Sequence, residues 1–422
     1  MKNIYRVFGV LVFSFISLFL LAGMQATVFA ATPGTVDPWV KSPNSLPAQI
    51  EKPATVTVNG FIYAIGGSDG ICRSEVQISQ IANDGSVGAW SNSPNSLPQG
   101  LCASSAVTYG GYIYVMGGTV VDAFGATVNV VYYTHVNNDG SIDPWQTSAN
   151  ALPQPRNSYT AVVNNGYIYV MGGSSGATNH DTVYYTHVNN DGSIDPWQTS
   201  ANALPQPVNR GMSVVSNGYV YVMGGINNDI PALILNTVYY APLNNDGTVG
   251  TWITSPVTLP DNIAGAGAIV QDNYIFIMGG YNVSAGDSSN KVYSAPINSD
   301  YSNGIFTQST NSMIDQLTQF GVVNNNGIVY VVGGYHYISV PPSQYISSEV
   351  YYTNVTGAPT LPPTPTPDPS TPTPSTPTTT TQSPSAPNTG AYKQNDILLP
   401  IIIIASGILY AIISFYAQKK SI

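Results

Sequence analysis

Short runs of aromatic and β-branched residues recur along residues 35–357, with turn residues between them. In one repeat the runs are residues 159–163, 167–171 and 182–186, followed by a fourth around Trp197. Asn-Gly and Asp-Gly pairs, typical of β-hairpin turns, separate neighbouring runs. The pattern predicts repeated units of four short antiparallel strands, named a, b, c and d in chain order.

The repeats keep a fixed register. An aromatic residue near strand d is followed 27 positions later by a Gly-Gly pair, six times in all, and residues 131–155 and 183–207 are identical. The repeated structural positions are Trp39, Trp90, Trp145, Trp197 and Trp252, and the glycine pairs Gly66, Gly67, Gly117, Gly118, Gly172, Gly173, Gly224, Gly225, Gly279, Gly280, Gly333 and Gly334. Six units of four strands predict an all-β fold, a six-bladed β-propeller. The chain begins with a lone strand d and ends with a, b and c, so we expect the N-terminal strand to complete the last blade.

The strand sequences support a family resemblance. A strand b that ends in Gly-Gly, a Tyr-rich strand c and a Trp-bearing strand d resemble the kelch-repeat β-propeller family, in a bacterial surface form. The resemblance covers residues 35–357. Tyr133 and Trp145 lie further apart than in usual kelch repeats, which implies a longer c–d hairpin, so the family's binding residues do not transfer directly.

Both ends of the chain predict export. Residues 1–30 have a basic start, an apolar stretch and a small-residue site between Ala30 and Ala31, as in a cleaved signal peptide; an uncleaved anchor is the alternative. Residues 358–386 are rich in Pro and Thr and predict an extended stalk.

Residues 387–422 resemble a Gram-positive sorting signal of the LPXTG type, with Ala386 where that motif has Leu. The motif-like residues are Pro387, Asn388, Thr389 and Gly390. An apolar run at 397–417, long enough for a transmembrane helix, and a basic tail follow. The resemblance implies cleavage after Thr389 and attachment to the cell wall, whereas the apolar run alone implies a permanent membrane anchor. Either way we expect an extracellular, anchored protein.

Charge narrows the possible partners. Residues 35–357 hold six Lys/Arg and nineteen Asp/Glu, a net charge of −13, which argues against nucleic acid as a partner.

Asp-Gly pairs such as Asp84-Gly85 fit hairpin turns better than calcium loops. No His or Cys spacing fits zinc, and no Ser-His-Asp set or phosphate loop is present, so we expect no metal and no cofactor. Cys72 and Cys102 lie in loops on the same face of adjacent predicted blades, which makes them a candidate disulfide in an exported protein.

Length variation is confined to one class of loop. Only the b–c connections differ, from 8 to 15 residues, and they share a face with the d–a connections. Insertions on one face of a repeat protein usually mark the binding face, although unconstrained loops would look the same. The ligand-binding candidates there are Arg73, Arg156, Arg210, His180, Phe124, Tyr281, Tyr335 and Tyr337. Arginines can clamp a carboxylate, and aromatic rings can stack on a sugar or pack against a protein. The alternative, implied by the kelch resemblance, is that Arg156 fills the family's usual Pro-Arg position, that the other arginines are surface residues and that the rings cover the propeller's own top.

These features favour a surface-anchored binding or adhesion module for a partner protein or glycan. One alternative is an extracellular enzyme, because three arginines on one face resemble sialic-acid-handling propellers such as the kelch-type N-acetylneuraminate epimerases, which implies sugar mutarotation. A second alternative is a structural protein of the cell envelope. The lack of a catalytic set makes an enzyme the less favoured interpretation.

Overall fold

The apolar runs form strands in the computed structural model, which describes residues 32–120, 126–227, 233–282 and 286–356. These ranges contain no helix, and hence none long and apolar enough to cross a membrane. The predicted signal peptide, stalk, sorting-like motif, helix at 397–417 and Phe124 all lie outside the described residues.

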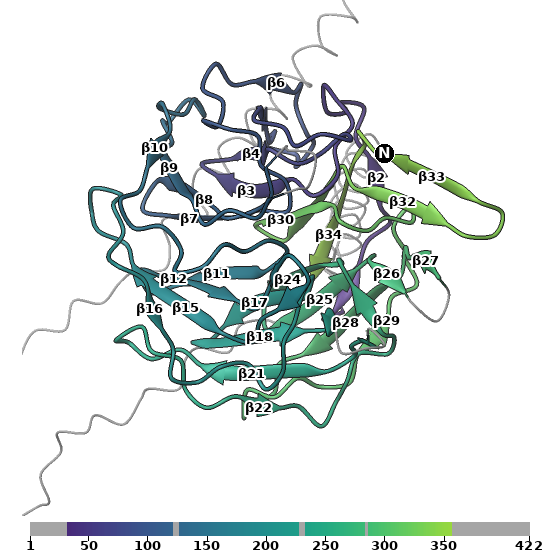
Figure 1. The fold of residues 1–422 in the computed structure, drawn as a ribbon. Helices are drawn as coiled ribbons and strands as arrows, with labels where there is room; N and C mark the ends of the chain where they lie inside the picture. The colour runs from purple at the N-terminus through teal and green to yellow at the C-terminus, as the bar shows by residue number, and fades with distance from the viewer. Residues whose placement is uncertain (1–31, 121–125, 228–232, 283–285, 357–422) are drawn as a thin grey trace, which may run out of the picture. The chain divides into compact units, whose positions relative to one another are not determined.

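Six antiparallel sheets in these ranges share one plan and stand around a common centre (Figure 1). The innermost strands are β3 (Ala54–Val58), β7 (Ser105–Tyr109), β11 (Thr160–Asn164), β17 (Met212–Ser216), β24 (Gly267–Gln271) and β30 (Gly321–Asn325). The second strands are β4 (Phe61–Ile65), β8 (Tyr112–Met116), β12 (Tyr167–Met171), β18 (Tyr219–Met223), β25 (Tyr274–Met278) and β31 (Ile328–Val332). The third strands are β5 (Val76–Gln80), β9 (Val131–His135), β15 (Val183–His187), β21 (Val238–Pro242), β28 (Val292–Pro296) and β34 (Val350–Thr356). The outermost strands are β6 (Ser91–Asn92), β10 (Gln146–Thr147), β16 (Gln198–Thr199), β22 (Ile253–Thr254), β29 (Thr307–Gln308) and β2 (Val40–Lys41).

The sheets close into a ring. Each innermost strand packs beside the next, and β30 packs beside β3. Strand β2 pairs with β34, Val40 opposite Tyr352, so the N-terminal strand completes the last blade as predicted. A further strand that the sequence analysis missed, β1 (Thr35–Val36), pairs with the end of β34. The predicted all-β propeller is confirmed.

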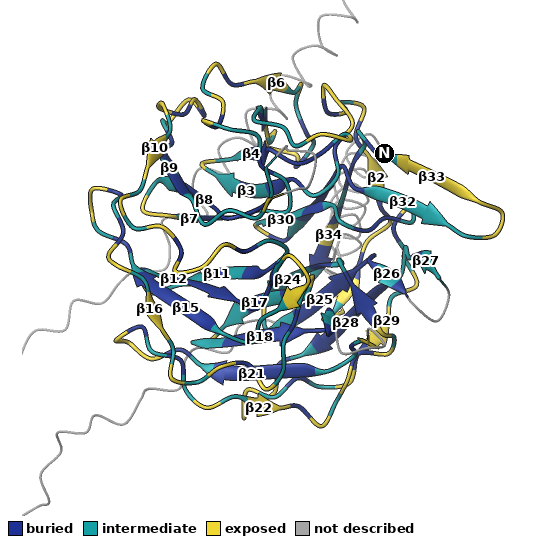
Figure 2. Ribbon diagram, viewed as in Figure 1, coloured by how far each residue is buried: buried dark blue, intermediate teal, exposed yellow. Residues whose placement is uncertain are grey.

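Burial follows from this arrangement. Each sheet is covered by neighbours on both faces, so the second strands are buried almost throughout, as at Ile62, Tyr63 and Ala64 (Figure 2). The buried tyrosines still need a hydrogen-bond partner. Tyr63 Oη donates to the carbonyl of Gly140 at 2.8 Å, in the Asp-Gly hairpin of the next blade. Those hairpins therefore tie neighbouring blades together.

The Gly-Gly pairs are required by the contact between blades. A Cβ on Gly172 would lie 2.3 Å from the Val208 carbonyl oxygen of the next blade's entering segment, and Gly172 has φ +67°. The second glycine, Gly173, donates its N–H to the same oxygen at 2.8 Å. The same contacts at Gly333 and Gly334 with Ile50 close the ring. Only glycine permits both the left-handed conformation and this approach.

The tryptophans also join blades, but from the edge rather than the interior. Trp145, Trp197 and Trp252 are half-buried, and each Nε1 donates at 3.2 Å to a backbone carbonyl in the preceding repeat. Trp39 is buried.

Candidate binding site

One face of the ring carries additional hairpins. The b–c connections form β13 (Ser174–Ser175) with β14 (Thr178–Asn179), β19 (Ile226–Asn227) with β20 (Leu233–Ile234), β26 (Tyr281–Asn282) with β27 (Asp287–Ser288), and β32 (Tyr335–Ile338) with β33 (Ser343–Ile346). Strand β23 (Ile263–Ala264), from a d–a connection, adds to β26. The longest hairpin, β32–β33, projects from the ring (Figure 1).

A belt of backbone hydrogen bonds holds this face at the centre. The residue two positions before each innermost strand has a left-handed backbone: Lys52, Ala103, Ser158, Arg210, Gly265 and Gln319. Along the ring, the N–H of Arg210 donates to the Ser158 carbonyl at 2.8 Å, and the N–H of Gly265 donates to the Arg210 carbonyl at 2.9 Å. The belt fixes Arg210 beside the axis although its side chain is exposed.

Two cavities adjoin the belt. One, of about 270 Å³, runs along the axis between the innermost strands and is lined mainly by small residues. The other, of about 250 Å³, lies between the loops of the last three blades. Its lining residues are Arg210, Ile226, Ala264, Tyr281, Thr318, Gln319, Tyr335 and Tyr337. This pocket brings together four of the predicted candidates: Arg210, Tyr281, Tyr335 and Tyr337.

The three tyrosines form one aromatic wall. Tyr335 and Tyr337 are two positions apart on β32, so their side chains share a face, and their ring centroids are 6.4 Å apart. The ring of Tyr281, on β26, lies 6.3 Å from that of Tyr337. Thr318 pairs with Tyr335 through two backbone hydrogen bonds of 2.8 and 2.9 Å, which aligns the base of β32 with the pocket.

The wall is fixed along its length. Near the tip of the hairpin, the Asp287 carboxylate accepts hydrogen bonds from the N–H and Oγ of Ser339 at 2.6 and 2.7 Å. On the other side, Tyr345 Oη donates to Asp315 at 2.5 Å, and burial together with this carboxylate raises the pKa of Tyr345. His336 stacks on Tyr345, with its Nδ1 2.9 Å from the Gln316 carbonyl. The aromatic surface is thus preformed.

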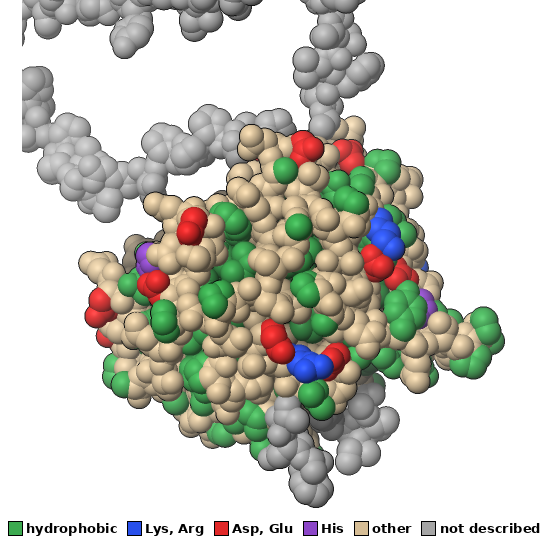
Figure 3. Space-filling model, turned by 90° about the horizontal axis from the view of Figure 1, so that it is seen from above, with side chains coloured by type: hydrophobic (Ala, Val, Ile, Leu, Met, Phe, Trp, Pro, Cys, Tyr) green, Lys and Arg blue, Asp and Glu red, His purple; other side chains and the backbone are tan. Residues whose placement is uncertain are grey.

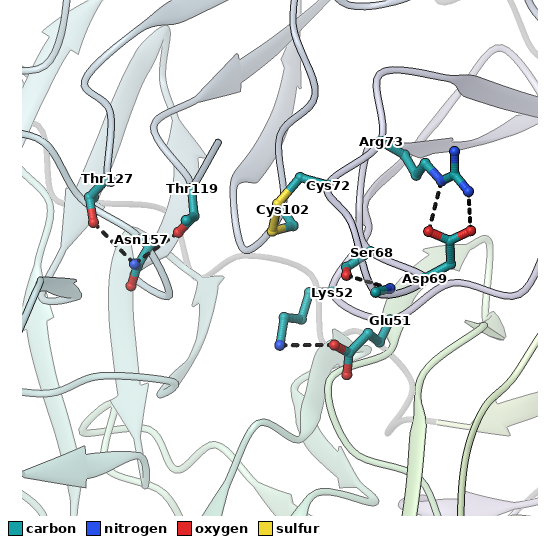
Figure 4. The surroundings of a disulfide bond; sticks show 11 residues. Glu51, Lys52, Ser68, Asp69, Cys72, Arg73, Cys102, Thr119, Thr127 and Asn157 are labelled. Atoms are coloured by element: carbon teal, nitrogen blue, oxygen red, sulfur yellow. Dashed lines mark hydrogen bonds and ion pairs between the residues drawn. A yellow bond between two sulfur atoms is a disulfide. The ribbon is translucent and has the colours of Figure 1, made fainter. Parts of the chain in front are cut away.

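Arg210 supplies positive charge to the pocket. Among the described residues its guanidinium forms no hydrogen bond and no ion pair. Surrounding protein lowers the pKa of Arg210, and the negative charge of Glu51 opposes that shift. Glu51 is itself paired with Lys52 at 3.0 Å (Figure 4). An arginine remains charged at any physiological pH, so the pocket offers a cation that can form two parallel hydrogen bonds.

Arg156 does not contribute to this face. Its side chain is fully buried, and its guanidinium donates to the Gly172 carbonyl at 2.7 Å, the Thr182 carbonyl at 3.2 Å and the Tyr184 hydroxyl at 3.2 Å. Burial lowers the pKa of Arg156, and the neighbouring Tyr184 partly offsets this. Arg156 is therefore a structural residue unavailable to ligand, in agreement with the alternative given above, and a clamp of three arginines is excluded.

Arg73 and His180 also lie apart from the pocket. Arg73 is paired with Asp69 in its own loop, with Nε 2.8 Å from the carboxylate (Figure 4). The Nε2 of His180 lies 2.8 Å from Ser175 Oγ inside its hairpin, and burial and then Arg156 lower the pKa of His180.

The two cysteines form a disulfide between the first two blades. Cys72 and Cys102 have Cα atoms 5.0 Å apart and are joined through their sulfurs, the pairing expected from the sequence (Figure 4). Cys72 belongs to the first b–c loop, and Cys102 to the connection entering β7. The bond ties two loops of the candidate face together.

The surface beside this face is largely uncharged. Figure 3 shows acidic side chains scattered singly, and the few basic side chains in view lie beside acidic ones. Within the described ranges, no group of three or more His, Cys, Asp or Glu side chains could hold a metal ion.

Comparison with known proteins identifies the repeat. The family model described as the KLHDC2/KLHL20/DRC7 Kelch-repeats domain matches residues 52–280 and 103–334, together more than half of the chain. The chain belongs to the kelch-repeat family. The kelch repeat and BTB domain-containing protein A55 of vaccinia virus (strain Western Reserve) is 27% identical over 186 residues, which cover 44% of this chain and 29% of the viral protein. The kelch repeat and BTB domain-containing protein 1 of cowpox virus (strain Brighton Red) is also 27% identical over 186 residues, which cover 44% of this chain and 30% of the viral protein.

The matched part of this kelch chain thus spans less than a third of the length of each of these two curated relatives. Among solved structures, that of YjhT is similar, with a TM-score of 0.57 and 14% identity over 73% of this chain and 95% of that one. At this identity the likeness concerns the fold alone.

Sequence reasoning missed half of the pocket lining: Ile226, Ala264, Thr318 and Gln319. A register was present for two of these residues: Ile226, like Tyr281 and Tyr335, directly follows a Gly-Gly pair, and Gln319 is at the belt position that Arg210 occupies two repeats earlier. Ala264 and Thr318 carry no such signal.

Proposed function

We propose that this kelch propeller is a cell-surface binding module that recognises a partner protein or glycan through the pocket lined by Arg210, Tyr281, Tyr335 and Tyr337. The observation that carries the proposal is the pocket itself, on the face that holds the variable loops. It combines a preformed aromatic wall with a cation that forms no hydrogen bond or ion pair among the described residues. Kelch-repeat domains typically mediate protein interactions, which agrees with this assignment.

The position of the last described residue fits the proposal. Strand β34 begins next to the β32–β33 hairpin and runs away from it, so Thr356 lies towards the opposite face, paired with Thr35. The last described residue therefore lies away from the pocket face.

The binding proposal is tested with a glycan array and a peptide array probed with the mature chain. Tyr337→Ala and Arg210→Gln should each weaken the strongest signals about tenfold. The matched controls are Tyr109→Ala, an exposed tyrosine where β7 turns into β8, and Arg73→Gln, a half-buried arginine outside the pocket that is paired with Asp69. Signals that fall equally in pocket and control variants would refute the assignment.

The proposed location needs its own test. In the source cell, the intact chain should fractionate with membrane or wall, and a chain ending before residue 387 should appear in the medium. Recovery of the intact chain from the cytosol would refute surface display.

A further inference from the structure

One hairpin on the face opposite the pocket departs from the repeat. The c–d hairpins lie on that face because successive strands alternate in direction. Four of them carry a left-handed glycine at one position, with φ between +81° and +83°: Gly85, Gly140, Gly192 and Gly247. The hairpin that joins β28 to β29 has Tyr301 there instead, with φ +65°. Outside the belt, every other left-handed residue with a side chain in the described ranges is Asn or Asp, the types that tolerate this conformation. Tyr301 is therefore an exception that the turn itself does not require.

The ring of Tyr301 forms a flat platform. In three of the glycine hairpins the glycine lies directly against an aromatic ring of the preceding blade, as Gly192 does against Tyr112. Tyr219 is the corresponding ring of the fourth blade, and Tyr301 stacks on it with centroids 4.1 Å apart and an interplanar angle of 14°. Tyr301 is 37% exposed. Because Tyr219 covers one face of the Tyr301 ring, the exposed area lies on the other face and at the edges.

A second departure from the repeat adjoins the first. In two earlier blades the strand-c tyrosine donates its hydroxyl at 2.8 Å to a glutamine of the outermost strand: Tyr133 to Gln146 and Tyr185 to Gln198. At this register the fourth blade places Tyr240 opposite Ile253, which is 45% exposed. The rings of Tyr240 and Tyr219 lie 6.3 Å apart. An apolar strip, exposed at both ends, therefore runs from Ile253 to Tyr301 where other blades carry polar residues or glycine.

The size and charge of the strip select among ligands. A stable protein interface covers about 800 Å² on each partner, far more than two exposed side chains offer. Tyr219 and Tyr301 are stacked closely on each other, so they leave no space for a cation enclosed between rings. The exposed Asp300 accepts hydrogen bonds from the Oγ and N–H of Ser302 at 2.6 and 3.0 Å, which lower the pKa of this carboxyl. Asp300 is therefore ionised at neutral pH and repels an anionic ligand.

A neutral saccharide fits these constraints. The C–H groups on one side of a pyranose ring form a flat apolar face that can stack on an aromatic ring, and sugar hydroxyls donate to carboxylates. Ser302 occupies only the Oδ1 oxygen of Asp300, which leaves Oδ2 for a ligand hydroxyl. We propose that this hairpin is a second binding site, for a neutral saccharide that stacks on Tyr301 and donates a hydroxyl to Asp300. The site is separate from the pocket and does not depend on it.

Affinity electrophoresis of the mature chain tests the site, in native gels that each contain one soluble neutral polysaccharide: laminarin, dextran, pullulan, mannan or xyloglucan. A gel with polygalacturonate is the anionic control. The decisive variant is Tyr301→Gly, which restores the glycine of the other hairpins and removes a left-handed side chain, so it should fold like the parent. Tyr301→Phe keeps the platform. Tyr109→Ala, at an exposed tyrosine of another turn on the same face, and Tyr337→Ala, in the pocket, are the controls.

At least one neutral polysaccharide should retard the parent. Its affinity should be about tenfold lower for Tyr301→Gly and unchanged for Tyr301→Phe, Tyr109→Ala and Tyr337→Ala. Three results would overturn the proposal: no retardation of the parent by a neutral polysaccharide, equal retardation of Tyr301→Gly, or retardation by polygalacturonate alone. Self-association of the parent that Tyr301→Gly abolishes would do the same, because a second copy would then cover the strip. The pocket stands or falls separately, on the variants of Tyr337 and Arg210.

Discussion

The substitution Gly333→Ala tests the contact that closes the ring. Gly333 has φ +62°, and an added Cβ would lie 2.4 Å from the Ile50 carbonyl oxygen, a backbone atom that cannot turn aside. The left-handed conformation costs an alanine about 1 kcal/mol. Moving Ile50 away also weakens the 2.8 Å hydrogen bond from Gly334, which adds about 1 kcal/mol, and relief of the overlap adds about 1 kcal/mol more. The expected loss of unfolding free energy is about 3 kcal/mol.

Gly60→Ala is the matched control. Gly60 has φ +78°, but nothing lies within 4 Å of an added Cβ, so only the conformational cost of about 1 kcal/mol remains. Urea unfolding of the two variants, followed by tryptophan fluorescence, should differ by about 2 kcal/mol. If Gly333→Ala is no more destabilising than Gly60→Ala, the glycine pairs are not explained by contact between blades.

Three further predictions concern stability. Arg156→Met should lower the unfolding free energy by about 3 kcal/mol because the Gly172 and Thr182 carbonyls lose a buried donor, and unchanged urea unfolding would contradict the buried role. Replacing Cys72 and Cys102 by serine should cost about 3 kcal/mol for a sequence separation of 30 residues, and identical unfolding of this double variant and the parent without reductant would refute the bond. Burial raises the pKa of Asp261, but hydrogen bonds from Tyr293 and Lys291 outweigh it, so the net pKa is lowered. A lowered carboxyl pKa stabilises the fold at neutral pH and is lost as pH falls through the folded value, below about 3.9. Asp261→Asn should therefore lower stability at pH 7 and show a smaller further loss towards pH 3, and an equal acid loss in parent and variant would contradict the assignment.

The repeat register made much of the fold predictable. The constant spacing from the aromatic residue to the Gly-Gly pair is the length of chain that runs from the outermost strand of one blade to the end of the second strand of the next. The lone strand at Trp39 had one vacant position to fill, and Val40 pairs with Tyr352 there. Strand β1 escaped prediction because two residues, Thr35 and Val36, carry no periodic pattern.

The site was only partly predictable, because a sequence shows the loop on which a residue lies and not the direction of its side chain. Arg156 and Arg210 occupy the same d–a connection of successive repeats but differ in register. Arg210 stands at the left-handed belt position, beside the axis. Arg156 stands two positions earlier in its repeat than the belt residue Ser158, and its side chain turns inward beneath Tyr184. The pocket also combines residues from three repeats, which become neighbours only through the ring's curvature.

Hydrogen–deuterium exchange of the mature chain, measured with and without the strongest array ligand, locates the binding surface. Binding through the pocket should protect Tyr281, residues 335–346 and the segment around Arg210. Protection confined to the turns at Asn59-Gly60 and Asn165-Gly166, on the opposite face, would contradict it.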